Sequence, residues 1–126
     1  MENIEKPSRR ATGYNGEEIA RRYLEEKGYT IVEMNYTIRG GEIDIIAKDG
    51  EITVFVEVRY RFDESHAHPL DTFTPMKRHT LLRSVMFYIS KHRIPEDQIR
   101  IDFIGIMPKK DGTEGHRLWH VRGVEV

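Results

Sequence analysis

Apolar residues recur along the chain with two different periods, and the first clear period is helical. Within residues 13–27, four apolar side chains are spaced so that they share one helix face: Ile19, Ala20, Tyr23 and Leu24. This spacing is typical of a surface helix that packs one stripe against a core. Gly28 follows and favours a helix end at that point. The first helix is therefore predicted over residues 13–27.

A second helical pattern begins at Thr74-Pro75. This pair predicts a helix start, because threonine caps free amide groups and proline fits the first turn. The apolar face of this helix is expected to consist of Leu81, Leu82, Val85, Met86 and Ile89. Proline interrupts a helix, so this helix is expected to end before Pro95.

The remaining apolar segments are rich in β-branched and aromatic residues and predict strands. They are residues 29–38, 42–48, 51–62, 99–107 and 117–124. The second and third of these are separated only by Asp49-Gly50, a pair suited to the positive φ angles of a tight hairpin turn. The predicted order is αβββαββ, an α/β domain built on a mixed sheet.

Length and composition limit the protein to one domain. A chain of 126 residues buries one core. Residues 1–11 are polar and without a period, so they are predicted to form a flexible arm, with residues 12–126 as the single domain. The absence of cysteine excludes disulfides and thiolate metal sites. With no signal-peptide pattern and no long apolar run, the sequence predicts a cytoplasmic protein that does not enter a membrane.

The predicted hairpin gathers acidic residues on one side. A two-residue loop at Asp49-Gly50 would pair Asp44 with Phe55 and Glu42 with Glu57. Paired residues and alternate residues point to the same side of a sheet. One face is therefore expected to hold Glu42, Asp44, Glu57, Arg59 and Arg61. The other face is the predicted core and holds Ile43, Ile45, Ala47, Val54, Val56 and Val58.

Carboxylates that share one face of a hairpin repel one another. At ~4 Å the repulsion is roughly 4 kcal/mol for an effective dielectric constant of 20, and a divalent cation would reverse it. Oxygen ligands without cysteine favour Mg²⁺ first and Mn²⁺ second. The alternative is that Arg59 and Arg61 neutralise the acids and leave only a salt-bridged, solvated sheet face. A change of one residue in the loop length would also move one strand's side chains to the opposite face.

Three segments of the chain resemble the YraN-like family of small bacterial proteins. They are Gly13-Tyr14-Asn15-Gly16-Glu17, Gly41-Glu42-Ile43-Asp44-Ile45-Ile46-Ala47 and Val54-Phe55-Val56-Glu57-Val58-Arg59. The resemblance continues through Pro69, Thr74-Pro75, Lys77 and residues 100–103, and so covers nearly the whole chain after the arm. That family is similar to the restriction-endonuclease-like fold of archaeal Holliday-junction resolvases. Their αβββαβ core, a mixed central sheet flanked by helices, matches the predicted order.

This resemblance implies a metal-dependent endonuclease that acts on DNA phosphodiester bonds. Branched DNA is one possible substrate. The catalytic positions would be Glu17, Asp44, Glu57 and Arg59. The metal ligands would be Asp44, Glu57 and the main-chain carbonyl of Val58. Junction cutting usually needs paired sites, so a homodimer is compatible with this activity.

Position 59 departs from the pattern of these nucleases, which usually have lysine there. Arg59 stays charged, so it can orient a phosphate or stabilise developing negative charge, but it cannot act as a base. Water activated by a metal could still attack without a lysine. A second interpretation therefore stays open, in which the chain is a catalytically inactive nuclease-fold module that binds nucleic acid or a protein partner.

Positive charge is concentrated in the second predicted helix, although 20 basic residues nearly cancel 21 acidic residues overall. Residues 77–93 contain no acid, and their basic side chains are Lys77, Arg78, His79, Arg83, Lys91, His92 and Arg93. Four phosphate contacts would give a salt slope of about −3.6. The predicted nucleic-acid-binding residues are Arg59, Arg61, Lys77 and Arg78. The alternative is that this helix simply has a solvated basic face.

A third pattern, His66-Ala67-His68, has the spacing of two zinc ligands. It lies in a predicted loop beside Pro69 and has no evident third ligand. A mobile connection near the active face is the preferred interpretation of this loop.

Overall fold

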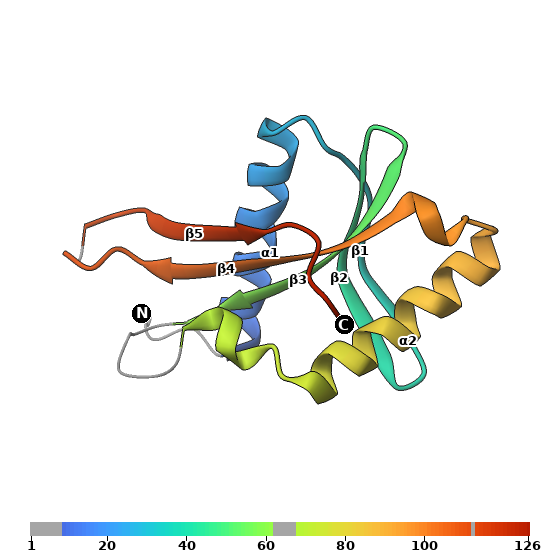
Figure 1. The fold of residues 1–126 in the computed structure, drawn as a ribbon. Coiled ribbons are helices and arrows are strands. Elements are labelled where there is room, and N and C mark those ends of the chain that lie inside the picture. The colour runs from blue at the N-terminus through green and yellow to red at the C-terminus, as the bar shows by residue number, and fades with distance from the viewer. Residues whose placement is uncertain (1–8, 62–67, 112) are drawn as a thin grey trace.

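The computed structural model describes residues 9–61, 68–111 and 113–126 (Figure 1). The helices are α1 (Arg9–Glu26) and α2 (Pro75–His92), with 3₁₀ turns η1 (Pro69–Thr72) and η2 (Glu96–Gln98). The strands are β1 (Thr30–Ile38), β2 (Gly41–Asp49), β3 (Ile52–Tyr60), β4 (Ile99–Pro108) and β5 (His116–Val121). This order confirms the predicted αβββαββ arrangement. Neither helix is both long and apolar enough to span a bilayer in the described part of the chain.

The five strands form one mixed sheet in the order β1-β2-β3-β4-β5. Neighbouring strands are antiparallel except for β3 and β4, which run parallel and are connected through α2. Helix α1 packs on one face of the sheet and α2 on the other (Figure 1). The predicted mixed sheet flanked by helices is therefore confirmed.

Both faces of the β2–β3 hairpin are buried, whereas the sequence predicted a core on one face only. Ile46 and Phe55 lie on the face predicted to carry the acids, and both are fully buried under α2. Ile43 also packs in the α2 cluster, apart from Ile45 on the α1 side. Opposite them on β1, Asn35 has a φ of 53°. Such a left-handed residue interrupts the regular alternation of side chains.

The hairpin turn lies one residue later than predicted. Asp49 pairs with Ile52, so Gly50 and Glu51 form the turn. Only Gly50 has a positive φ, of 62°, as expected for a turn that requires glycine first. The predicted pairing of Asp44 with Phe55 is wrong, because Phe55 pairs with Ile46.

The predicted pairing of Glu42 with Glu57 is also wrong, because the ladder stops at Ile45 and Val56. The register differs from the predicted one by two residues, which leaves each side chain on the same face of the ladder. The error in the turn therefore does not move Asp44 away from Glu57.

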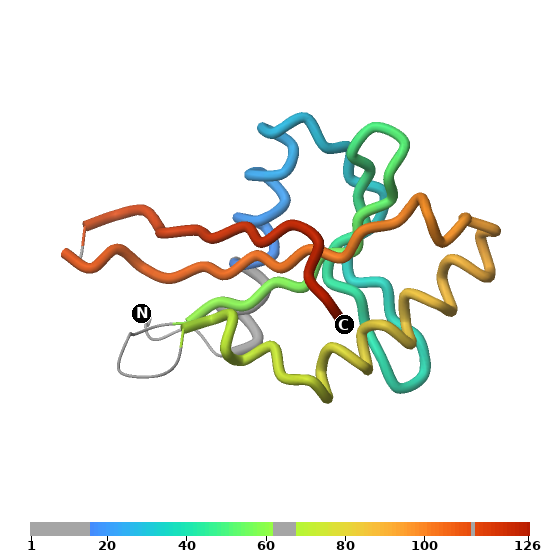
Figure 2. Tube along the Cα trace, in the orientation of Figure 1, coloured from blue at the N-terminus to red at the C-terminus, as the bar shows by residue number. Residues whose placement is uncertain are grey.

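The sheet splits beyond this last pair. From Glu57 onward β3 pairs only with β4, while β2 continues towards Gly41 paired only with β1. Figures 1 and 2 show the two strands diverging from each other. Asp44 and Glu57 are the first residues past the last β2–β3 pair, so the split begins between two carboxylates.

The helix ends follow local signals. Helix α1 begins at Arg9, inside the range predicted as an arm, while residues 1–8 lie outside the described part. Thr74 caps α2 by accepting a hydrogen bond from the Lys77 amide at 3.3 Å, as predicted. The predicted apolar face is buried at Leu81, Val85 and Ile89, and partly buried at Leu82. Met86 is 39% exposed, so its assignment to this face is wrong.

Candidate metal and phosphate site

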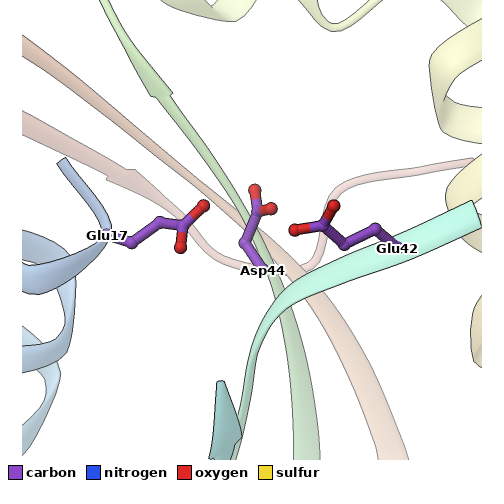
Figure 3. Close-up of side chains that lie close together, drawn as sticks. All are labelled: Glu17, Glu42 and Asp44. Atoms are coloured by element: carbon purple, nitrogen blue, oxygen red, sulfur yellow. The ribbon is translucent and has the colours of Figure 1, made fainter. Parts of the chain in front are cut away.

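Three carboxylates converge at the split in the sheet. Glu17 comes from α1, and Glu42 and Asp44 come from β2 (Figure 3). One oxygen from each lies within 4.8 Å of the others. Glu42 is exposed, whereas Glu17 and Asp44 are partly buried. The sequence had assigned Glu42 to the acidic face without giving it a catalytic or metal-binding role.

Close packing brings these three residues together. Gly16 precedes Glu17, and a Cβ atom there would lie only 3.2 Å from the Cβ of Tyr60. The absence of a side chain thus lets α1 approach the end of β3. Gly41 precedes Glu42, and a Cβ atom there would overlap the hydroxyl of Ser84 on α2. These two glycines therefore let α1 pack closely on the end of β3 and the start of β2 pack closely on α2.

Asp44 bridges the split. Its Oδ2 accepts a hydrogen bond of 2.8 Å from the main-chain amide of Val58. Because β2 no longer pairs with β3 at this level, the carboxylate takes the place of a main-chain partner. The Val58 amide is thereby satisfied, and Asp44 is fixed beside β3.

Glu57 lies next to this cluster but is held in an ion pair. Its Oε2 is 2.7 Å from a terminal guanidinium nitrogen of Arg59. The Glu57 side chain is only 10% exposed, and that of Arg59 is 30% exposed. The Nε of Arg59 is buried and lacks a hydrogen-bond partner among the described residues. Such an unsatisfied buried donor is costly.

The carboxylates at the split resist ionisation. Burial, followed by the charge of Asp44, raises the pKa of Glu17 to about 7. Burial also raises the pKa of Asp44, although the Val58 hydrogen bond opposes that shift. Burial and the charge of Asp44 raise the pKa of Glu57, against the opposing charges of Arg59 and Lys77. Burial is the largest cause for all three acids, and the charges of neighbouring carboxylates add to it.

The four predicted nucleic-acid-binding residues have different surroundings. Arg59 is in the site, and the exposed Lys77 is close enough for its charge to lower the pKa of Glu57. The main-chain amide of Arg61 donates to the Ile106 carbonyl at 3.0 Å, continuing the pairing with β4.

Arg78 instead binds the chain itself. Its Nε donates to the Phe73 carbonyl at 2.7 Å, and a terminal nitrogen donates to the Glu125 carbonyl at 2.9 Å. Its guanidinium group also lies over the Phe73 ring, 4.9 Å from the centroid. Arg78 therefore holds the C-terminal segment against the start of α2.

A second charged cluster lies away from the split, around Asp102 on β4. Asp102 is 0% exposed and accepts hydrogen bonds from Arg100 Nε at 2.8 Å and from the Gly123 amide at 3.1 Å. Its other oxygen is 2.7 Å from Nε2 of His120, whose Nδ1 is 3.0 Å from the hydroxyl of Tyr23.

Arg100 extends this network to Tyr29 and Asp49, at 2.6 and 3.1 Å. Burial alone would raise the pKa of Asp102, but hydrogen bonds from His120, Arg100 and Gly123 lower it below its ordinary value. The network connects α1, β4 and β5, and its closed hydrogen bonding favours a structural role. One sign of this network is visible in the sequence, namely an aspartate inside the apolar run of residues 101–107.

The predicted histidine pair is only partly described, because His66 lies outside the described residues. His68 Nδ1 accepts a hydrogen bond of 3.1 Å from the Leu70 amide. Its ring packs edge-on against Trp119, with the centroids 4.6 Å apart. His68 therefore caps η1.

Comparison with known proteins identifies relatives of this chain. The chain is 47% identical over 102 residues to a UPF0102 protein of Carboxydothermus hydrogenoformans, covering 81% of this chain and 86% of that protein. It is 38% identical over 116 residues to a UPF0102 protein of Coxiella burnetii, and the match covers 90% of this chain and 92% of that protein. A UPF0102 protein of Marinobacter nauticus is 43% identical over 99 residues, and the match covers 79% of this chain and 80% of that protein.

The family model described as Uncharacterised protein family UPF0102 matches residues 16–106. That segment begins at the glycine that precedes Glu17 and contains the whole carboxylate cluster, Arg59 and Lys77. His120 lies beyond the matched segment. As the YraN-like resemblance implied, the chain belongs to the UPF0102 family.

Proposed function

We propose that this protein is a metal-dependent endonuclease that hydrolyses phosphodiester bonds in DNA, with branched DNA among its substrates. The observation that carries this proposal is the convergence of Glu17, Glu42 and Asp44 within 4.8 Å at the split in the sheet. Three acids in one partly buried place destabilise one another unless positive charge is supplied. A cation would find carboxylate ligands there. A substrate phosphate could bind at the same place together with its cations.

The donor set fits a hard divalent cation. Carboxylate oxygens alone favour Mg²⁺ or Mn²⁺, and Glu17, Glu42 and Asp44 would hold such an ion. Glu57 and the Val58 carbonyl, the other ligands implied by the resemblance, belong to the strand that borders the split. When bound, the ion would lower the pKa of a water molecule and stabilise charge on the phosphate.

Arg59 is suited to bind the scissile phosphate. Glu57 fixes one of its terminal nitrogens, and its buried Nε lacks an acceptor among the described residues. The Arg59 side chain is 30% exposed, so a phosphate oxygen could contact its accessible part, and the permanent charge of arginine would stabilise the extra negative charge of the transition state. Arg59 cannot remove a proton from water, so its role is to orient and to stabilise.

The test is cleavage of plasmid and four-way-junction DNA with and without Mg²⁺, using Glu17→Gln and its neighbour Glu18→Gln. Glu18 pairs with Arg21 and Arg22 on the helix surface, which makes it a matched control. We expect metal-dependent cleavage that Glu17→Gln reduces at least about tenfold and Glu18→Gln leaves unchanged. Equal activity of both variants, or the same cleavage in EDTA, would rule the proposal out.

A second candidate function is a nuclease-fold module that binds nucleic acid without cutting it. The observation in its favour is Arg59, which replaces the usual lysine and is already paired with Glu57 at 2.7 Å. Under this alternative, DNA binding weakens with added salt and no divalent metal produces cleavage. A protein that bound neither metal nor DNA would instead point to a protein partner, and a calorimetric titration with Mn²⁺ separates these cases.

A further inference from the structure

A groove with both polar and apolar lining residues lies at the far end of α2 from Lys77. Its volume is about 360 Å³, and it is bordered by the end of α2, the segment before β4 and the β2–β3 hairpin. No acid lines it; its apolar lining residues are Val32, Ile94 and Pro95, and its polar ones are Lys48, Thr53, Tyr88, His92, Arg93 and Gln98. These side chains offer positive charge, a hydroxyl donor and amide donors, which together suit an oxyanion.

The cations of this groove are not neutralised by the protein. Among the described residues, neither Lys48 nor Arg93 makes a side-chain ion pair or hydrogen bond. Other arginines are engaged, as Arg21 is with Glu18 and Arg100 is with Asp102. Unpaired cations that face one groove favour an anionic ligand over a neutral one.

Arg93 occupies an unusual backbone position for this role. It caps the C-terminus of α2 with φ 56° and ψ 46°, in the left-handed region where glycine or asparagine is usual. The helix end itself carries a partial negative charge of about half a unit, which favours a cation at this position. Lys48 and Arg93 together exceed that partial charge, and the nearest acids in the sequence, Glu96 and Asp97 of η2, are not among the residues that line the groove.

The groove lies in line with the carboxylate site along α2. From Lys77 to His92 the helix advances by about 22 Å, which corresponds to roughly six or seven base-pair steps of a DNA duplex. Between them, the exposed side chains of Arg83 and Lys91 are also free of ion pairs among the described residues. Helix α2 contains no acidic residue along its whole length. A nucleic-acid strand could therefore follow this helix from one end to the other.

We propose that this groove binds a backbone phosphate of the DNA, roughly six or seven base pairs from the bond positioned at the carboxylate site. The inference rests on the proposed function and adds a second anchoring point to it. The anchor sets the direction in which the duplex leaves the site. It also makes the affinity for long DNA greater than the carboxylate site and Arg59 alone would provide.

The experiment compares Arg93→Gly and Lys48→Gln with Arg22→Gln, a control on the exposed surface of α1. Affinity for a fluorescent duplex is measured by anisotropy without divalent metal, so that no cleavage occurs. We expect each groove variant to bind about three- to tenfold more weakly and to reduce the salt slope by about 0.9. Arg93→Gly should fold at least as stably as the native chain, since glycine suits its left-handed backbone.

A second measurement locates the contact on the DNA. Neutral methylphosphonate groups are introduced one at a time at increasing distance from the scissile bond. A loss of affinity near the sixth or seventh base pair is expected for the native chain and not for Arg93→Gly. Inorganic phosphate that shifts groove resonances in NMR spectra, while DNA affinity is unchanged in both groove variants, would show a site for free anions and overturn the proposal.

The outcomes separate this inference from the proposed function. If the native chain cuts DNA but the groove variants bind it with unchanged affinity and salt slope, only the groove proposal fails. If the native chain binds DNA through the groove but never cuts it, the nuclease proposal fails and the groove remains a DNA site. If the native chain does not bind DNA at all, both fail.

Discussion

The two buried charge clusters of this protein are built from similar residues and have opposite electrostatic character. Around Asp102, each carboxylate oxygen meets donors from Arg100, His120 or a main-chain amide, and the pKa of the acid falls. At the split in the sheet, Glu17 and Asp44 gather with fewer donors, and the pKa values of both rise. The charge of Asp102 is balanced by donors within the protein, whereas the carboxylates at the split have fewer such partners.

This difference gives a physical criterion for choosing between them. Asp102 lies deeper than Asp44, and burial alone would make it the more conspicuous candidate for catalysis. Satisfied hydrogen bonds nevertheless identify a structural network, while mutual repulsion identifies a site that gains stability from a ligand. Four substitutions or changes of condition test the contrast, in order of decreasing expected effect.

Asp102→Ala should have the largest effect, and on stability. It removes the shared acceptor of Arg100 and His120 and leaves buried donors without a partner. We expect a loss of about 3–5 kcal/mol in the free energy of unfolding, or on the order of 10–20 °C in Tm. Thermal and urea denaturation measure it. Asp71→Ala, on the exposed surface of η1, is the control and should change stability by less than about 0.5 kcal/mol. Equal stabilities of the two variants would remove the structural role assigned to Asp102.

Asp44→Asn should affect activity far more than stability. The amide oxygen of asparagine can still accept the Val58 hydrogen bond, but the charge that would hold a cation is lost. We expect cleavage to fall at least about 100-fold with a change in Tm of only a few degrees.

Asp49→Asn serves as the control for this change, since Asp49 lies on the same strand at the end away from the split. Its cleavage rate should match that of the native chain. Retention of metal-dependent cleavage by Asp44→Asn would contradict the assignment of Asp44 to the site.

The two clusters should respond to pH in opposite directions. The pKa of Glu17 in the folded state, about 7, lies above its ordinary value of 4.5, and burial shifts the pKa values of Asp44 and Glu57 the same way. The stability that these acids contribute is fully present below their ordinary pKa values. It is lost as the pH rises through about 7. Asp102, with a lowered pKa, contributes stability that is lost instead on acidification.

Denaturation at a series of pH values measures this contrast. Glu57→Gln should reduce the loss of unfolding free energy that accompanies the rise in pH by on the order of 2 kcal/mol. Added Mg²⁺ should restore stability at pH 8 in the native chain and not in Asp44→Asn. A stability that rises steadily between pH 5 and pH 8 would show that the pKa values of the acids at the split are not raised in the folded state.

Tyr23→Phe should give the smallest effect of the four. It removes one hydroxyl, 3.0 Å from Nδ1 of His120, and leaves the ring packed edge-on against the imidazole. We expect a loss of about 1 kcal/mol and no change in DNA cleavage. A larger loss of cleavage than of stability would indicate that the Asp102 network takes part in the chemistry.

Local sequence patterns were sufficient for the elements of the fold. Helix α2 begins at its predicted Thr74 cap, and both helices and all five strands occur in the predicted order. These features depend on the secondary-structure propensities of neighbouring residues and on the spacing of apolar residues. Both can be read from a single sequence. The same patterns placed Asp44 and Glu57 near each other, because an error of two residues in register preserves the face of each strand.

The tertiary structure alone decided which acids meet and which are neutralised. Glu42 meets Glu17 through tertiary packing, in which Gly16 lets α1 approach β3 closely and Gly41 lets β2 approach α2 closely. His120 completes the Asp102 network from a different strand. The sequence by itself determined the elements, their order and a hairpin rich in acids. Whether each charge finds a partner depends on long-range packing and burial, which no local period encodes.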